Sequence, residues 1–136
     1  SGTIEAFERA NKHIDIIGAE PAMANDAARS LEAGKIIPNE FEPQTIADGT
    51  RTLSVGDLTF PVIQRGVNSI LEVSEEKIVE GLRLYFTHAN LKCEPTGALS
   101  LGAVLQNVDE FRDKRVGVVV SGGNVDPTLY SQLLVG

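Results

Sequence analysis

The sequence predicts an α/β protein that forms part of a doubly wound, mainly parallel β-sheet with flanking helices. The run Val116–Val120 is apolar throughout, which is typical of a strand buried on both faces of a parallel sheet. Asp126 and Pro127 follow it, and these are residue types preferred where a helix begins. Along the rest of the chain, short apolar runs alternate with helical patterns, which is the order expected of a parallel sheet.

In the first half of the chain, a helical pattern covers residues 1–11 and a strand pattern covers residues 14–19. A helix is expected over residues 22–33, because Gly34 supplies a typical helix end. Residues 35–55 show no clean period. Loops of this length in a compact domain are usually functional or disordered, and the apolar residues in this one favour an ordered, functional loop.

The second half begins with a predicted strand over residues 69–73 and a helix capped by Ser74. A further helix is expected over residues 95–106; it is apolar nearly all round and should therefore be central to the fold. Residues 107–115 form a charged connection. The buried face of the helix after Ser74 is predicted to hold Ile78, Leu82, Tyr85, Phe86 and Ala89.

Size and composition exclude several classes of function. The 136 residues suffice for one domain with a core, and the net charge of −7 argues against nucleic acid and anionic membranes as partners. No apolar run reaches the length of a membrane span. The single cysteine excludes an internal disulfide and favours a cytoplasmic setting. The chain begins Ser-Gly-Thr without methionine or a signal peptide, so we expect it to be a piece of a longer protein.

The turn Ser121-Gly122-Gly123-Asn124 follows the predicted strand at its carboxyl end, where ligands bind in open α/β sheets. Glycines there allow close backbone approach or positive φ. We expect Ser121 to contact a small molecule. A bare tight turn is the alternative, because this segment has neither the dinucleotide-binding glycine motif nor the lysine of a P-loop.

Two carboxylates, Glu20 and Asp26, and the carbonyl of Ala24 follow the end of the first predicted strand. Hard oxygen ligands of this kind suit Mg²⁺ or Ca²⁺. Acidic residues at a helix N-terminus are the alternative interpretation of the same pattern. The two histidines, His13 and His88, lie in no metal-spaced cluster, and Cys93 is expected to be a buried small apolar residue.

Six short segments occur in an order that resembles the pyridoxal-phosphate-dependent serine/threonine dehydratases and the eukaryotic-type serine racemases. The resemblance covers nearly the whole chain but matches only the C-terminal part of those enzymes. It implies the fold of the tryptophan-synthase-β-like pyridoxal-phosphate enzymes. The segments are GAEP (18–21), LEAGK (31–35), TIADG (45–49), VSEEKI (73–78), EPTGA (94–98) and VVSGGNVD (119–126).

By this resemblance, Ser121 would hydrogen-bond the pyridine nitrogen of pyridoxal 5'-phosphate. A neutral hydroxyl does not force that nitrogen to be protonated, so the ring is a milder electron sink, which suits β-elimination. Gly122 and Asn124 would shape the same wall, Glu94 would lie near the ring, and the 45–49 loop, with Gly49, would line the site. Three residues match the divalent-cation motif of the family, for Mg, Ca or Mn: Glu20, Ala24 through its carbonyl, and Asp26.

The resemblance also implies what this chain lacks. The Schiff-base lysine of the family lies upstream, so no catalytic residue is assigned within these 136 residues. Asn90 stands where some racemases of the family have an ATP-binding lysine. We therefore expect residues 1–136 to be the C-terminal part of the large cofactor-binding domain, with no regulatory domain.

The parent protein would be an L-serine/L-threonine ammonia-lyase or a serine racemase that acts on a small hydroxy amino acid, and we expect it to be a homodimer. The isolated piece is expected to be inactive. A non-catalytic α/β module that binds a metal or a ligand is the alternative function, and a piece without its sheet neighbours could also self-associate. The sequence does not distinguish serine, threonine and hydroxyaspartate as substrates.

Overall fold

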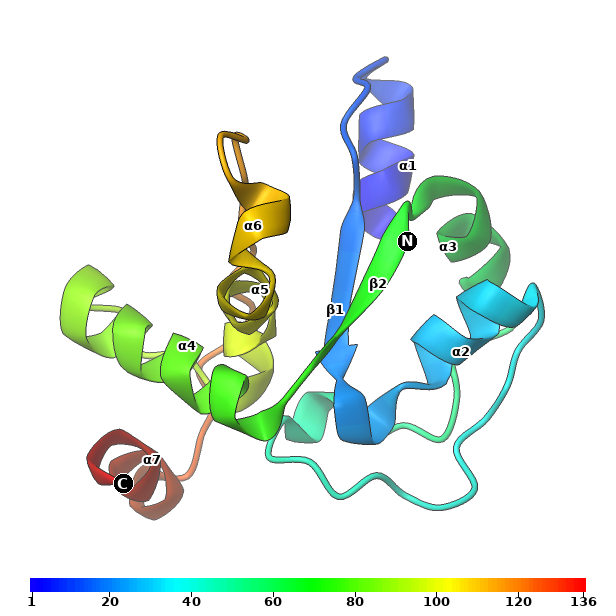
Figure 1. Cartoon of the computed structure of the whole chain (residues 1–136). Coiled ribbons are helices and arrows are strands. Elements are labelled where there is room, and N and C mark those ends of the chain that lie inside the picture. Colours follow the sequence, from blue (N-terminus) through cyan, green and yellow to red (C-terminus); the bar gives the residue numbers. More distant parts are fainter.

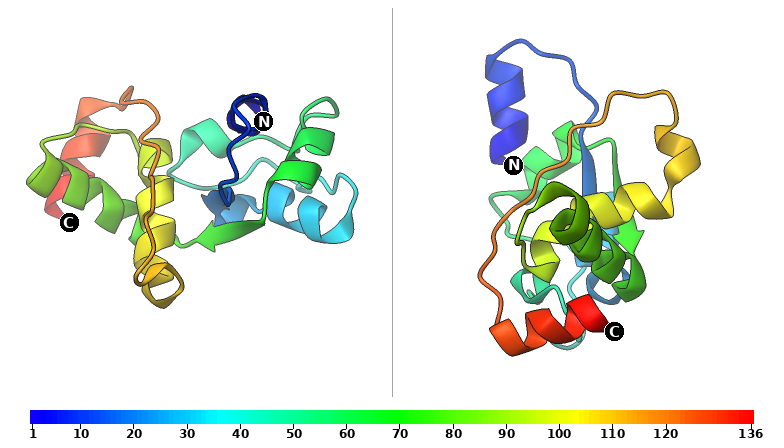
Figure 2. Two further views of the ribbon diagram at one scale, coloured as in Figure 1. Left: turned by 90° about the horizontal axis from the view of Figure 1, so that it is seen from above. Right: turned by 90° about the vertical axis from the view of Figure 1, so that its left-hand side faces the viewer.

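A computed structural model describes all 136 residues, with two short strands between two groups of helices (Figure 1). The helices α4 to α7 lie on one side of the strands and α1 to α3 on the other, and the view from above shows the same division (Figure 2). The elements are α1 (Gly2–Arg9), β1 (Ile17–Pro21), η1 (Ala22–Ala24), α2 (Asp26–Ala33), η2 (Asp48–Thr50), α3 (Phe60–Gly66), β2 (Ser69–Val73), α4 (Glu75–Ala89), α5 (Pro95–Gln106), α6 (Val108–Phe111) and α7 (Pro127–Val135).

The two strands pair in parallel, with Ile17 opposite Ser69 and Pro21 opposite Val73. The predicted parallel α/β class is therefore confirmed, and β2 has the predicted bounds. The first strand is shifted: β1 covers Ile17–Pro21, whereas the sequence pattern predicted residues 14–19. Pairing with β2 sets these bounds, because β1 pairs with β2 only from Ile17 to Pro21, opposite Ser69 to Val73.

The prediction of a strand at Val116–Val120 is wrong for this chain. The segment is not a strand, and Val119 is 70% exposed. A strand forms only where a neighbour offers backbone partners, and the sheet here consists of β1 and β2 alone. The segment instead runs beside α5, where the Ser100 hydroxyl donates to the carbonyl of Val119 at 2.7 Å.

The core lies where α4 and α5 pack together and against the strands. Ile78 and Leu82 of α4 are fully buried and Tyr85 nearly so, as predicted. Buried residues of α5 lie beside them, and Gly81 and Gly102 let the two helices approach closely.

The buried face of α4 is narrower than the sequence predicted, because Phe86 and Ala89 are exposed. Phe86 meets the Tyr130 ring of α7 edge-on and keeps 46% of its surface exposed. The last turn of α4 therefore contributes less to the core than its apolar spacing suggested.

Local signals account for several helix ends. The Ser74 hydroxyl accepts from the Lys77 N–H, and the Asp126 carboxylate accepts from the Thr128 and Leu129 N–H groups, as expected of N-caps. Gly34 ends α2 in the left-handed conformation. The predicted helix over 22–33 is divided into η1 and α2, and the predicted charged connection over 107–115 contains the short helix α6.

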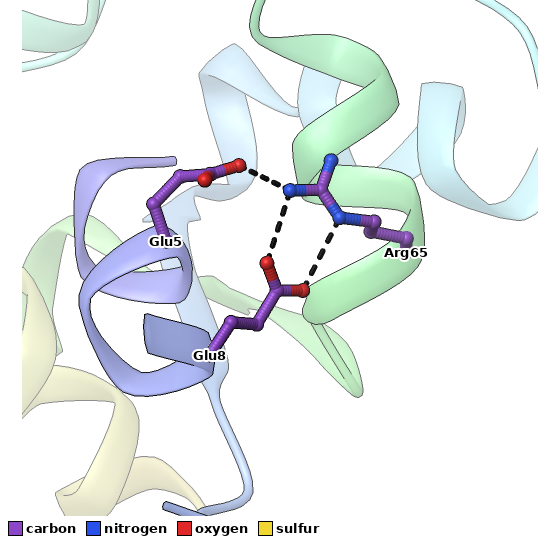
Figure 3. Close-up of polar contacts among 3 residues, drawn as sticks. All are labelled: Glu5, Glu8 and Arg65. Carbon is purple, nitrogen blue, oxygen red and sulfur yellow. Dashed lines mark hydrogen bonds and ion pairs between the residues drawn. The ribbon is translucent and has the colours of Figure 1, made fainter. Parts of the chain in front are cut away.

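Helix α1 docks on α3, an element that the sequence pattern did not predict. Ile4 is buried, and its side chain fills the space beside Gly66. Arg65 of α3 forms ion pairs with Glu5 and Glu8 of α1 (Figure 3). The three charged side chains are 39–47% exposed, so we expect Ile4 and Gly66 to contribute more to this contact than the ion pairs do. No helix of the structure is long and apolar enough to cross a membrane.

Candidate functional site

The turn Ser121–Asn124 lies against the N-terminal end of α5, and Glu94 holds it there. The Glu94 N–H donates to the carbonyl of Gly122 at 3.2 Å, and the Glu94 Oε2 accepts from the Asn124 N–H at 2.9 Å. The structure thus brings together Ser121, Gly122, Asn124 and Glu94, which the sequence separates by about 30 residues. One carboxylate and one N–H, both from Glu94, fix two residues of the turn.

Close packing explains why the turn requires glycine. Gly122 has a φ of +77°, and a Cβ there would lie 2.6 Å from the Glu94 Oε1. A Cβ on Gly97 would lie 2.9 Å from the Gly122 carbonyl oxygen. The turn therefore rests on the first turn of α5 with no room for side chains between them.

The Ser121 hydroxyl and the Asn124 side-chain amide form no hydrogen bond within the chain, and both residues are exposed. The backbone of the turn is fixed, whereas these two polar side chains remain available to a ligand. This combination, a rigid backbone with free neutral polar groups, suits recognition of a ring nitrogen or another single polar atom.

The loop that carries Gly49 reaches the same end of α5. The Gly49 N–H donates to the Thr96 hydroxyl at 3.1 Å. Glu75, the first residue of α4, holds the same loop: its carboxylate accepts from the Thr45 hydroxyl at 2.6 Å and from the Ile46 N–H at 2.8 Å. These hydrogen bonds fix the loop at Thr45, Ile46 and Gly49, and its part in binding stays a prediction.

For three residues that support the site, the sequence predicted no role there: Lys92, Thr96 and Glu75. Their partners lie about 30 to 47 residues away in the sequence, so no local spacing could reveal them. Thr96 belongs to the segment EPTGA and Glu75 to the segment VSEEKI, and these two segments were the available signals for them.

The predicted cation ligands follow one another along the chain, with Glu20 in β1, Ala24 in η1 and Asp26 at the start of α2. Glu20 and Asp26 are both more than nine-tenths buried, and Ala24 is fully buried. The Glu20 Oε1 accepts from the Ala28 N–H at 2.9 Å, and the Asp26 Oδ1 accepts from the Asn39 side chain at 3.0 Å. Neither carboxylate forms an ion pair.

The electrostatics of this cluster are unfavourable without a cation. Burial raises the pKa of Glu20 to about 7, although the Ala28 N–H acts in the opposite direction, and the nearby Asp26 and Glu72 carboxylates raise it further. No three His, Cys, Asp or Glu side chains come together as a metal site. A cation here would therefore depend on a backbone oxygen as well, and two carboxylates with one carbonyl fit a hard divalent ion.

Cys93 is a core residue and not a reactive group at the site. Cys93 is fully buried, as predicted, and burial raises the pKa of its thiol, which makes it a poor nucleophile at neutral pH. Neither histidine lies in a metal-binding cluster.

A family model described as "Pyridoxal-phosphate dependent enzyme" matches residues 1–122. The chain belongs to this family. Among curated relatives of this pyridoxal-phosphate family, the chain is 41% identical to an L-threo-3-hydroxyaspartate ammonia-lyase of Pseudomonas sp over 136 residues, which is 100% of this chain and 42% of that protein. It is 36% identical to a serine racemase of Schizosaccharomyces pombe over 134 residues, 98% of this chain and 41% of that protein.

Solved structures of pyridoxal-phosphate enzymes agree with the fold. A T.th. threonine deaminase matches with a TM-score of 0.83 at 44% identity, covering 92% of this chain and 45% of that one. A maize serine racemase matches with a TM-score of 0.87 at 36% identity, covering 96% and 41%. The chain thus spans about two fifths of the length of the relatives it matches. The predicted family, its fold and pyridoxal phosphate as its cofactor are confirmed; the divalent cation stays a prediction.

Proposed function

We propose that this chain is the C-terminal part of the large cofactor-binding domain of a pyridoxal-phosphate enzyme that acts on a small hydroxy amino acid. The reaction is loss of the β-hydroxyl as water, followed by hydrolysis of the resulting enamine to a keto acid and ammonia, or racemisation at Cα. The relatives named above are ammonia-lyases and racemases, which supports this reaction class. The observation that carries the proposal is the turn Ser121–Asn124, whose backbone is fixed by Glu94 while its serine hydroxyl stays free.

Pyridoxal phosphate, when bound, supplies the electron sink that stabilises negative charge at Cα. The part of this chain is to bind and orient the ring. We propose that the Ser121 hydroxyl donates a hydrogen bond to the pyridine nitrogen, and that this neutral partner leaves the nitrogen unprotonated. Gly122 gives the ring room to approach, and Asn124 and Gly49 border the same face.

We propose that Glu94 supports the turn from the side of α5 and not from the side that faces the ring. Its carboxylate accepts from the Asn124 N–H, so its charge is held in the base of the turn. A carboxylate placed there stabilises the backbone without serving as the ring-nitrogen partner. We infer that Ser121 takes that position.

The Schiff-base lysine is proposed to lie in the part of the parent protein outside these 136 residues. The isolated chain should therefore show no lyase or racemase activity, because covalent attachment of the cofactor and the base that goes with it are missing. We also propose that the parent protein is a cytoplasmic homodimer, which size-exclusion chromatography and fractionation of the source cells would test.

A substitution series at Ser121 in the parent protein tests the proposal. Ser121→Ala should weaken cofactor binding by about tenfold, the effect of one lost hydrogen bond of about 1.5 kcal/mol. Ser121→Asp should change the absorbance of the bound cofactor, because a carboxylate favours the protonated ring. Ser131→Ala, on the exposed face of α7, is the matched control. Unchanged affinity and absorbance in both Ser121 variants would contradict the role of Ser121.

A divalent cation at Glu20, the Ala24 carbonyl and Asp26 is the second part of the proposal. Two buried carboxylates without an ion-pair partner support it. Mg²⁺, Ca²⁺ or Mn²⁺ at millimolar concentration should raise the midpoint of thermal unfolding of the chain, since a ligand that binds only the folded state stabilises it. Asp26→Asn should abolish this effect, and Asp57→Asn, an exposed position, should preserve it. An equal response in all three proteins would contradict the site.

A further inference from the structure

The geometry points to Lys92 as a positioning residue that holds the Ser121–Asn124 turn and, through it, the Ser121 hydroxyl. This inference deepens the proposed function, since it depends on the role proposed there for Ser121. Lys92 lies in the connection between α4 and α5. Its Nζ donates to the carbonyl of Gly123 at 3.2 Å and lies 5.9 Å from the centre of the Tyr130 ring.

The Lys92 ammonium supplies a hydrogen bond to Gly123, the turn residue between the two that Glu94 holds. Glu94 fixes Gly122 through its N–H and Asn124 through its carboxylate. Gly123, between them, is held by the Lys92 side chain and lies on the Lys92 backbone, where a Cβ would be 2.9 Å from the Lys92 carbonyl oxygen. Residues 92–94 thus hold three successive residues of the turn, each through a different group.

The other contact of Lys92 ties the turn to the C-terminal helix. Tyr130 belongs to α7, is 8% exposed, and packs edge-on against Phe86 with ring centres 6.0 Å apart. An ammonium near the aromatic ring is attracted to its π face. Lys92 therefore bridges the turn and the helix that follows it, which limits movement of the turn away from α5.

Lys92 differs in this respect from the other lysines. Lys77 pairs with Glu80 on the surface of α4, and Lys12, Lys35 and Lys114 form no ion pair and no side-chain hydrogen bond. Lys92 is exposed, so the strength of its contacts is modest and its loss should loosen the turn without unfolding the chain. The expected effect is about threefold to tenfold on opening of the turn.

Amide hydrogen exchange of Asn124 in this chain tests the contact directly. Lys92→Met should speed exchange of the Asn124 N–H about threefold to tenfold, Lys92→Arg should restore most of the protection, and Lys114→Met should leave it unchanged. Equal exchange in Lys92→Met and Lys114→Met would overturn the inference. Circular dichroism of each variant verifies that the helices are intact.

The parent protein with bound cofactor provides the second readout. Lys92→Met should weaken pyridoxal-phosphate binding about threefold to tenfold, in the same direction as Ser121→Ala, and change the absorbance of the bound cofactor. Faster exchange with unchanged affinity and absorbance would overturn the positioning role. If Ser121→Ala itself has no effect on the cofactor, the proposed function of Ser121 fails, and the exchange of Asn124 still decides whether Lys92 holds the turn.

Discussion

Replacement of Gly122 by alanine should destabilise the chain far more than the same replacement at Gly117, an exposed glycine in the same segment. The backbone at Gly122 has a φ of +77°, and forcing an L-residue into this left-handed region costs about 1–2 kcal/mol. The added Cβ would lie 2.6 Å from the Glu94 Oε1, so the carboxylate must move. Its hydrogen bond to the Asn124 N–H is then lost, at a cost of about 1.5–3 kcal/mol for a charged acceptor.

The backbone strain and the lost hydrogen bond are not fully additive, because one local movement of the turn relieves part of both. We therefore expect a total of about 2–4 kcal/mol. This is a large part of the roughly 5–15 kcal/mol that holds an ordinary domain together. Urea denaturation followed by far-ultraviolet circular dichroism measures the change in the free energy of unfolding.

Gly117→Ala is the matched control for Gly122→Ala. Gly117 lies in the same segment, a Cβ there would meet nothing within 4 Å, and its φ is not positive. Alanine there should leave the free energy of unfolding unchanged or raise it by a few tenths of a kcal/mol, since it restricts the unfolded chain. If Gly122→Ala costs no more than Gly117→Ala, the turn is not held against Glu94 as the structure describes.

Three further predictions concern other parts of the chain. Glu75→Ala should lower the free energy of unfolding by about 2–3 kcal/mol, because the Thr45 hydroxyl and the Ile46 N–H lose a charged acceptor. Its control, Glu80→Ala on the exposed face of α4, should cost less than about 1 kcal/mol in the same urea assay. In metal-free buffer the raised pKa of Glu20, about 7 against an ordinary 4.5, means that the folded state binds this proton more tightly than the unfolded state. The stabilisation that the bound proton gives, about 3 kcal/mol, is fully present below pH 4.5 and is lost as the pH rises to about 7. Glu20→Gln should flatten this part of the curve of stability against pH. The same slope in both proteins would show that Glu20 is not the group responsible. Gly66→Ala should displace Ile4 and detach α1, with a larger loss of stability than Arg65→Met, whose ion pairs are exposed; the reverse order would mean that charge rather than packing holds α1.

The elements that the sequence predicted well are those with signals inside the element. Ser74 at the start of α4, Pro95 at the start of α5 and the Asp126-Pro127 pair at the start of α7 each fix a helix end by local chemistry. Strand β2 also matched its pattern. The parallel class followed from the alternation of these elements.

The failures have a common cause, which is dependence on partners far away in the sequence. Val116–Val120 has the composition of a buried strand but no strand to pair with in this chain, and Phe86 has the spacing of a core residue but meets α7 only edge-on, at Tyr130. At the candidate site, the sequence singles out the residues of the turn because their types suggest a ligand, and their contact with a ligand stays a prediction. The residues that hold the turn, Lys92 above all, could not, since only the fold brings Lys92 to Gly123.

The visible spectrum of the parent protein purified from its source, together with its intact mass, tests the central claim most directly. We predict a mass well above the 14.6 kDa of this chain and the yellow absorbance of protein-bound pyridoxal phosphate, which L-serine, L-threonine or hydroxyaspartate bleaches or shifts. A protein of 14.6 kDa that binds no pyridoxal phosphate would contradict the enzyme assignment and would favour the non-catalytic, ligand- or metal-binding module instead.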